Sequence, residues 1–149
     1  MVTTGSGSAA DRLAVFAPRR TRQVALGLAV GVTVLVVALA VVVPADFGWP
    51  DRVGFLLVGA LIDGFLWRQA TVRAVPSAHG LHVRNLFLSR DLEWAQVVSV
   101  RFGERPWVQL DLDDGDTLAV MGVQRSDGER ARAEARRLAG LVEDPPAGA

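Results

Sequence analysis

The most restrictive feature of the chain is an unbroken apolar run of twenty residues, Val24 to Val43, which contains no charge and no proline. As a helix rising about 1.5 Å per residue, this run spans about 30 Å, the thickness of a bilayer's hydrocarbon core. A domain of ordinary size rarely buries a helix that is apolar on every face. The run therefore predicts a membrane-spanning helix and argues against a buried core helix.

A second apolar run extends from Val53 to Trp67 and is interrupted only by Asp63. As a helix it spans about 22 Å, which is short for a bilayer, so the flanking arginines are expected to snorkel to the two surfaces. A re-entrant segment is the alternative. An intramembrane carboxylate is costly and therefore a functional candidate, but no second ionisable group lies at the depth of Asp63, so we expect no proton relay.

The two runs predict a transmembrane helical hairpin over residues 23–70, with helices at about 24–43 and 51–69. Each run contains a pair of small residues four positions apart, a pattern that lets helix backbones approach closely. Counted inward from the flanking arginines, the two pairs lie at matching depths. We therefore expect these small residues to pack on one another: Gly27, Gly31, Ala60 and Gly64.

The charge distribution predicts the orientation of the hairpin. Residues 1–43 hold four arginines and one aspartate, a net charge of +3. Residues 1–22 are expected to form a disordered to basic juxtamembrane segment. Because arginine-rich flanks stay on the cytoplasmic side, we predict a multi-pass protein of the cell membrane with both termini cytoplasmic. The rival interpretation is a signal peptide cleaved near Val43-Pro44-Ala45, although its apolar segment would be unusually long.

Beyond the hairpin, apolar and polar residues alternate as in strands with one exposed face. About six short antiparallel strands are expected, and Asp114-Gly115 is a strong hairpin signal between the last two. A capping box formed by Ser126 and Glu129 then predicts a helix that ends near Val142. The sequence thus predicts a small α+β domain over residues 71–143, capped by its C-terminal helix, and a disordered tail over residues 144–149.

Several classes of function are not expected. The chain has no cysteine, which excludes disulfides and thiolate chemistry. Residues 70–149 hold ten arginines and twelve acidic residues, so the domain has no basic face for nucleic acid. The acidic turn around Gly115 departs from the spacing of an EF-hand, and His79 and His82 have no obvious third ligand. We therefore expect no enzyme, no cofactor and no metal.

Five stretches carry a resemblance to a known group: Asp51-Arg-Val-Gly-Phe-Leu-Leu, Gly80-Leu-His-Val-Arg-Asn, Leu92-Glu-Trp-Ala-Gln-Val-Val, Pro106-Trp-Val-Gln-Leu-Asp-Leu and Gln124-Arg-Ser-Asp-Gly-Glu-Arg. From Phe16 onward, the chain resembles small actinobacterial two-span membrane proteins with a bacterial pleckstrin-homology (PH)-like domain, related to the mycobacterial low-molecular-weight antigen proteins. This resemblance implies a PH-like fold, an antiparallel β-sandwich or barrel capped by one helix. It implies no activity, because the role of the family is not established.

The expected partners follow from this architecture. The loop between the first two strands, Pro76 to Gly80, has no lysine or arginine, so we expect no phosphoinositide-type headgroup site. The leading hypothesis is a non-enzymatic membrane protein whose cytoplasmic PH-like domain docks a partner protein or another copy of itself. The alternatives are a module that senses lipids of the inner leaflet and an accessory subunit of a transport or secretion complex.

A further expectation concerns the turn after the second strand, which contains three consecutive large apolar residues between two arginines. If the first strand starts at the membrane, the second returns to it, so this turn is predicted to contact the bilayer. Burial of Leu86 and Leu88 in the core of the sheet is the competing explanation. The predicted membrane-contact tip consists of Arg84, Leu86, Phe87, Leu88 and Arg90.

Overall fold

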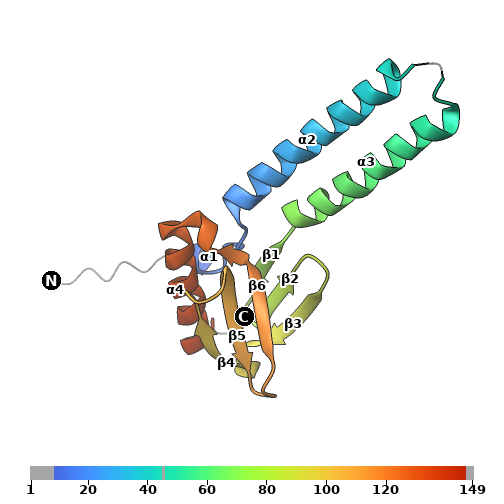
Figure 1. Ribbon diagram of the computed structural model, residues 1–149. Helices are drawn as coiled ribbons and strands as arrows, with labels where there is room; N and C mark the ends of the chain where they lie inside the picture. Colours follow the sequence, from blue (N-terminus) through green and yellow to red (C-terminus); the bar gives the residue numbers. More distant parts are fainter. Residues whose placement is uncertain (1–8, 45, 147–149) are drawn as a thin grey trace. The chain divides into compact units, whose positions relative to one another are not determined.

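The computed structural model describes residues 9–44 and 46–146 and divides into two compact units (Figure 1). One unit is formed by residues 19–71. The other combines the chain up to Pro18 with the chain from Val72 onward, so it contains segments that precede and follow the first unit in the sequence. The predicted disordered ends, residues 1–8 and 147–149, lie outside the described residues.

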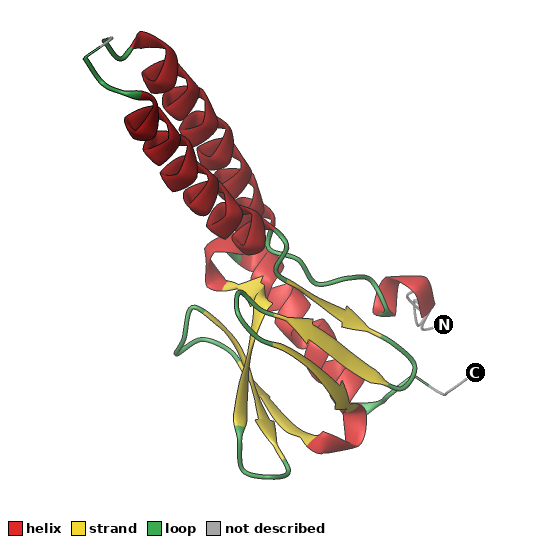
Figure 2. Ribbon diagram, turned by 90° about the vertical axis from the view of Figure 1, so that its right-hand side faces the viewer, coloured by secondary structure: helices red, strands yellow, loops and turns green. Residues whose placement is uncertain are grey.

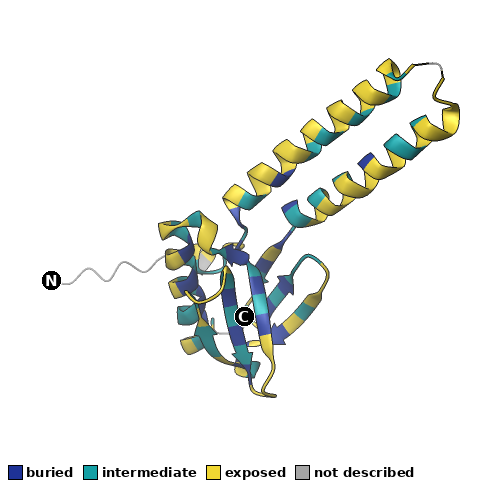
Figure 3. Ribbon diagram, in the orientation of Figure 1, coloured by how far each residue is buried: buried dark blue, intermediate teal, exposed yellow. Residues whose placement is uncertain are grey.

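The first unit is an antiparallel pair of helices, α2 (Arg19–Val42) and α3 (Trp49–Ala70). Both are long and apolar enough to cross a membrane by length and composition. Most of their side chains are exposed, which is shown by the predominance of yellow along both helices in Figure 3. The second helix is longer than its apolar run, and at about 33 Å it reaches the length that a bilayer core requires.

The closest approach within the helix pair is at Gly59. A Cβ atom on Gly59 would lie 2.8 Å from a methyl group of Val36, whereas a Cβ atom on Gly27, Gly31 or Gly64 would meet nothing within 4 Å. The expected packing of these three glycines on the opposite helix was therefore wrong. Ala60, the fourth residue of that prediction, is exposed. In the expected register Gly31 lies beside Ala60, whereas the observed contacts of Val36 with Gly59 and of Thr33 with Asp63 displace α3 by about one helical turn relative to α2.

The second unit contains six antiparallel strands, as predicted, in two sheets of three (Figure 2). Within the described residues the two sheets do not close into a barrel. Consecutive strands are neighbours in each sheet, joined by short turns, and alternate residues point into the core. The strands are β1 (Arg73–Pro76), β2 (Gly80–Arg84), β3 (Ser89–Glu93), β4 (Val97–Arg101), β5 (Trp107–Leu112) and β6 (Thr117–Gln124).

Helix α4 (Glu129–Glu143) contributes one apolar stripe to the core between the sheets. Its buried residues recur at helical spacing: Ala131, Ala135, Leu138 and Leu141. The predicted capping box was wrong. Ser126 lies in a single turn of 3-10 helix, η2 (Arg125–Asp127), and the N-cap of α4 is Gly128, without a side-chain cap. Gly128 has a φ of 61°, which glycine adopts without strain, so α4 begins only at Glu129.

The chain before the helix pair is part of the same core. After α1 (Ala9–Arg12), Phe16 pairs with Ala74 of β1 through two backbone hydrogen bonds of 2.8 Å. The Phe16 side chain is fully buried. A Cβ atom on Gly122 would lie 2.7 Å from the carbonyl oxygen of Phe16, so this close approach requires glycine. The sequence predicted a disordered to basic juxtamembrane segment over residues 1–22 and gave no sign that Phe16 joins the core.

Arg137 of α4 holds this segment in place. Its guanidinium group lies 3.8 Å from the centre of the Phe16 ring, a cation–π contact. The same group donates hydrogen bonds to the backbone carbonyls of Asp11, Arg12 and Ala14. One side chain thus supplies hydrogen-bond donors to three backbone carbonyls of this short segment.

We expect Phe16→Ala to lower the free energy of unfolding by about 3–5 kcal/mol, because it empties a fully buried aromatic site. Val15→Ala is the matched control, since Val15 is 47% exposed and its loss should cost less than about 0.5 kcal/mol. Denaturant unfolding of the full chain in detergent, followed by tryptophan fluorescence, measures both. Equal and small effects would show that the N-terminal segment is not part of the core.

The helix pair gives a second prediction. Gly59→Leu should weaken the association of α2 and α3 by about 1–3 kcal/mol, because its side chain would collide with Val36. Gly31→Leu introduces the same side chain at a position that meets nothing and should be neutral. The SDS concentration at which the helices separate, followed by energy transfer between a label on each helix, compares the two. A larger effect at Gly31 would contradict the register.

Candidate docking groove

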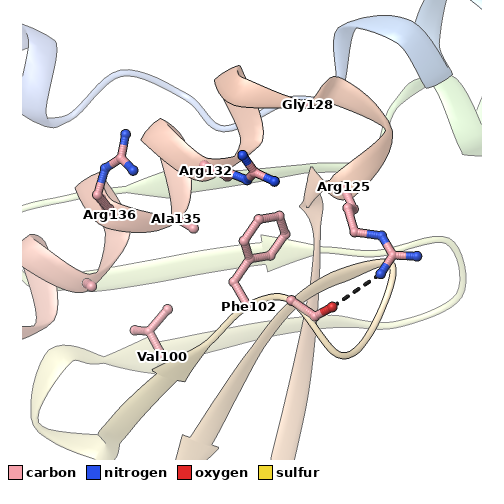
Figure 4. A pocket seen from close by; sticks show the side chains of 9 residues that line it. Val100, Phe102, Arg125, Gly128, Arg132, Ala135 and Arg136 are labelled. Carbon is pink, nitrogen blue, oxygen red and sulfur yellow. Dashed lines mark hydrogen bonds between the residues drawn. The ribbon is translucent and has the colours of Figure 1, made fainter.

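An open groove of about 610 Å³ lies between β4 and the first half of α4 (Figure 4). The strand and the segment after it provide one wall, and the helix with the preceding turn provides the other. Its lining residues are Val100, Phe102, Gly103, Arg125, Gly128, Arg132, Ala135, Arg136 and Ala139. The groove is therefore assembled from two parts of the sequence that are joined only through β5 and β6.

The floor of the groove is apolar. The ring of Phe102 projects toward the middle of the groove, between the helix and the turn before it (Figure 4). Val100 and Phe102 are only partly buried, although both pack against the core. Val98, at the shift in register between Val97 and Ser99, is 66% exposed. Large apolar side chains thus remain accessible along this strand and the residues that follow it.

The backbone of β4 has one unpaired edge. In the described sheet of β4, β5 and β6, β4 is at the end and pairs with β5 alone. Its other edge presents backbone N–H and C=O groups that are not part of that ladder. Such an edge can accept an extended peptide as an additional strand.

The helix side of the groove is basic. Arg125 donates a hydrogen bond to the carbonyl of Gly103 at 3.2 Å, which ties the turn before α4 to the end of β4 (Figure 4). Arg132 pairs with Glu129 one turn earlier. The guanidinium group of Arg136 has no ion pair or hydrogen bond within the described part of the chain. The first turns of α4 also add the partial positive charge of a helix N-terminus.

Asp111, in β5 just before the acidic turn, is bonded within the domain. Asp111 accepts hydrogen bonds from Arg101, Ser99 and Thr117. The bond from Arg101, followed by that from Ser99, holds the pKa of the Asp111 carboxyl below its usual value. Among the described residues, no group of three or more acidic or histidine side chains is arranged to hold a metal ion.

The two histidines are not brought together as a site. His82 pairs with Asp91 of β3 across the sheet. His79 lies in the turn between β1 and β2, where its backbone N–H donates to Ser77. Ser77 also accepts a hydrogen bond from the backbone N–H of Gly80. This turn therefore closes on itself through a serine.

The apolar turn between β2 and β3 is exposed. A backbone hydrogen bond from Asn85 to Leu88 closes it, and the side chains of Phe87 and Leu88 are mostly exposed. Core burial of Leu88 is therefore excluded. Arg90 pairs with Asp114 at 3.2 Å and with Asp116 at 3.7 Å, so this predicted tip residue is engaged within the domain.

Asp63 has one partner in the helix pair. The hydroxyl of Thr33 donates a hydrogen bond of 2.6 Å to one carboxylate oxygen of Asp63. The other oxygen is buried and has no hydrogen-bond partner in the described residues. Sequence analysis did not identify Thr33, because its role depends on the register of the two helices.

The comparison with known families concerns the second unit. Residues 71–141 match the family model described as the bacterial PH domain. In these residues the chain is similar to a bacterial PH domain. The two three-stranded sheets and the C-terminal helix are consistent with this fold. A PH-like domain is typically a non-catalytic interaction module, and nothing in the described residues indicates an enzyme.

Relatives of the chain are known in mycobacteria. Uncharacterized proteins of Mycobacterium tuberculosis and Mycobacterium bovis are each 34% identical to it over 86 residues, which is 57% of this chain and 56% of each relative. The chain thus spans little more than half the length of these relatives. No solved structure matches the chain.

The groove was not found by sequence analysis, although parts of it left a signal. Val98, Val100 and Phe102 alternate and were assigned to a strand, but the sequence does not show which strand lies at the edge of a sheet. Arg132 and Arg136 fall mostly off the apolar stripe of the helix, and nothing in the sequence distinguishes them from its other exposed arginines. Only the packing of α4 beside β4 brings the two sets together.

Proposed function

We propose that this protein is a non-enzymatic membrane protein that holds a PH-like interaction domain at the cytoplasmic face of the cell membrane, where the groove beside β4 docks a partner protein. The observation that carries the proposal is an apolar, arginine-lined groove next to an unpaired strand edge. Membrane insertion is supported by the two long apolar helices. The resemblance to two-span actinobacterial proteins and to the low-molecular-weight antigen proteins supports the same arrangement.

The way the chain enters the PH-like domain supports one-sided anchoring. Phe16 precedes the helix pair and Ala74 follows it, yet they are hydrogen-bonded neighbours in one domain. Two crossings return the chain to its starting side, as this pairing requires. The arginines before α2 favour the cytoplasm for that side. Cleavage near Val43 would remove Phe16 from the core, which argues against a signal peptide.

The topology can be tested with reporter fusions. A reporter after Ala149 should give a cytoplasmic signal, and a reporter inserted in the loop of residues 44–48 should give an external one. The mass of the purified protein should include the residues before Val43. An external signal at the C-terminus, or a mature protein that begins after Val43, would contradict the proposal.

The groove favours an extended segment over a helix as its occupant. A strand added to β4 would satisfy the backbone groups of its unpaired edge, which a docked helix cannot do. Alternate side chains of such a segment would point toward the floor of the groove, where Phe102 and Val100 offer apolar contact. The backbone bonds would supply affinity, and the floor would select apolar residues at every second position.

The charge of the groove favours an acidic segment. Arginine lines the helix side, and Arg136 has no partner within the described residues. Carboxylates on the docked segment would find guanidinium donors and the N-terminal end of α4. Because these charges lie at an exposed rim, they should speed association and select against basic segments more than they add affinity.

Display selection on the full-length protein in detergent tests the docking site without a known partner. Random twelve-residue peptides should be enriched for acidic residues alternating with apolar ones. An enriched peptide should bind the Arg136→Glu variant at least tenfold more weakly. Methylation of alternate backbone nitrogens in the peptide should abolish binding, because it removes the donors of an added strand.

Two controls make the docking result specific. Arg73→Glu reverses the same charge on the other sheet and should leave the affinity unchanged. Phe102→Ser should weaken binding while the domain stays folded, as judged by its unfolding transition. Enrichment of basic or sequence-independent peptides, or equal weakening by Arg73→Glu and Arg136→Glu, would refute docking in this groove.

A further inference from the structure

One end of the PH-like domain carries both connections to the helix pair. Phe16 pairs with Ala74, so the chain leaves the domain after Pro18 and re-enters it at Val72, close to the first residue of β1. The last residue of β2, Arg84, is paired with Arg73 at the same end. The turn between β2 and β3 therefore projects from the end of the domain that is tethered to the helices.

Two arginines face each other at this end. Arg73 and Arg84 are directly opposed in the antiparallel register of β1 and β2, so their side chains share one face of the sheet. Like charges in directly opposed positions destabilise a sheet. Neither guanidinium group has an ion pair or hydrogen bond to another described residue. The pair thus offers two guanidinium groups, side by side, for an anion.

Large apolar side chains lie immediately beyond the pair. Phe87 is 77% exposed and Leu88 is 57% exposed. The turn that carries them is well ordered, because Asn85 bonds to Leu88 and its side chain contacts the backbone of Ala119 and Met121 in β6. A fixed turn that exposes two large apolar residues beside two arginines is suited to an anionic apolar surface.

We propose that this end of the domain binds anionic phospholipid: Arg73 and Arg84 hold a headgroup phosphate, and Phe87 and Leu88 enter the acyl boundary. The site rests on the proposed membrane insertion but is separate from the docking groove. Arginine suits a phosphate because its planar donors bind two oxygens at once. The site includes Arg73 in place of Arg90, because Arg90 already pairs with Asp114 and Asp116.

The lipid site differs in position from the loop between the first two strands. That turn, Pro76 to Gly80, lies at the opposite end of β1 and β2 and contains no arginine or lysine. Its backbone groups are used by Ser77. The arginine pair therefore lies at the end of the domain that is connected to the helices, and this turn lies at the other end.

The test uses the full-length protein with an environment-sensitive fluorophore on Phe87→Cys, which is unique because the chain has no other cysteine. The protein is placed in nanodiscs of phosphatidylcholine alone or with increasing phosphatidylglycerol. We expect a blue shift of the emission that depends on phosphatidylglycerol. Arg73→Gln and Arg84→Gln should each raise the half-maximal phosphatidylglycerol fraction about fivefold, and the double variant should abolish the shift.

Arg136→Gln is the matched control, because it removes the same charge from the helix side of the groove and should leave the half-maximal fraction unchanged. Inorganic phosphate added to the phosphatidylcholine discs tests a free ion and should cause no shift. An emission maximum that does not change with the phosphatidylglycerol fraction would contradict the proposed lipid site. An equal effect of Arg136→Gln and Arg73→Gln would also contradict it. If the protein does not co-elute with the discs, membrane insertion itself is wrong and the site fails with it.

Discussion

The pairing of Phe16 with β1 is the contact on which the architecture of this protein depends. It joins the chain before the helix pair to the chain after it in one domain. It also places a large aromatic ring in the core that the later strands and α4 complete. Because Phe16 and Ala74 are far apart in sequence, this contact closes a long loop, which is entropically costly and slow. The apolar core and the bonds of Arg137 offset this cost.

The same pairing determines which end of the domain is connected to the helices. Both connections to the helices emerge beside β1, so the opposed arginines and the apolar turn after β2 belong to the tethered end. The groove is formed by other elements, β4 and α4. The proposed lipid site and the proposed docking groove are therefore separate surfaces of one small domain.

The near-neutral charge of the domain conceals local differences. Several acidic residues are used internally: Asp111 pairs with Arg101, and Asp114 pairs with Arg90. Arg73, Arg84 and Arg136 have no such partner within the described residues. A net charge summed over the sequence could not show that the remaining arginines lie in the groove and at the tethered end.

The sequence by itself determined the local structure: the two long apolar helices, the six strands, the turn at Gly115 and the C-terminal helix. Periodicity and turn residues act over a few positions, so they are visible without a fold. Sequence reasoning missed the burial of Phe16, the register that brings Gly59 to Val36, and the late start of α4 after Gly128. Each of these depends on contacts between distant segments, which only the tertiary structure decides, because a side chain's burial is set by the elements that pack around it and not by its neighbours in sequence.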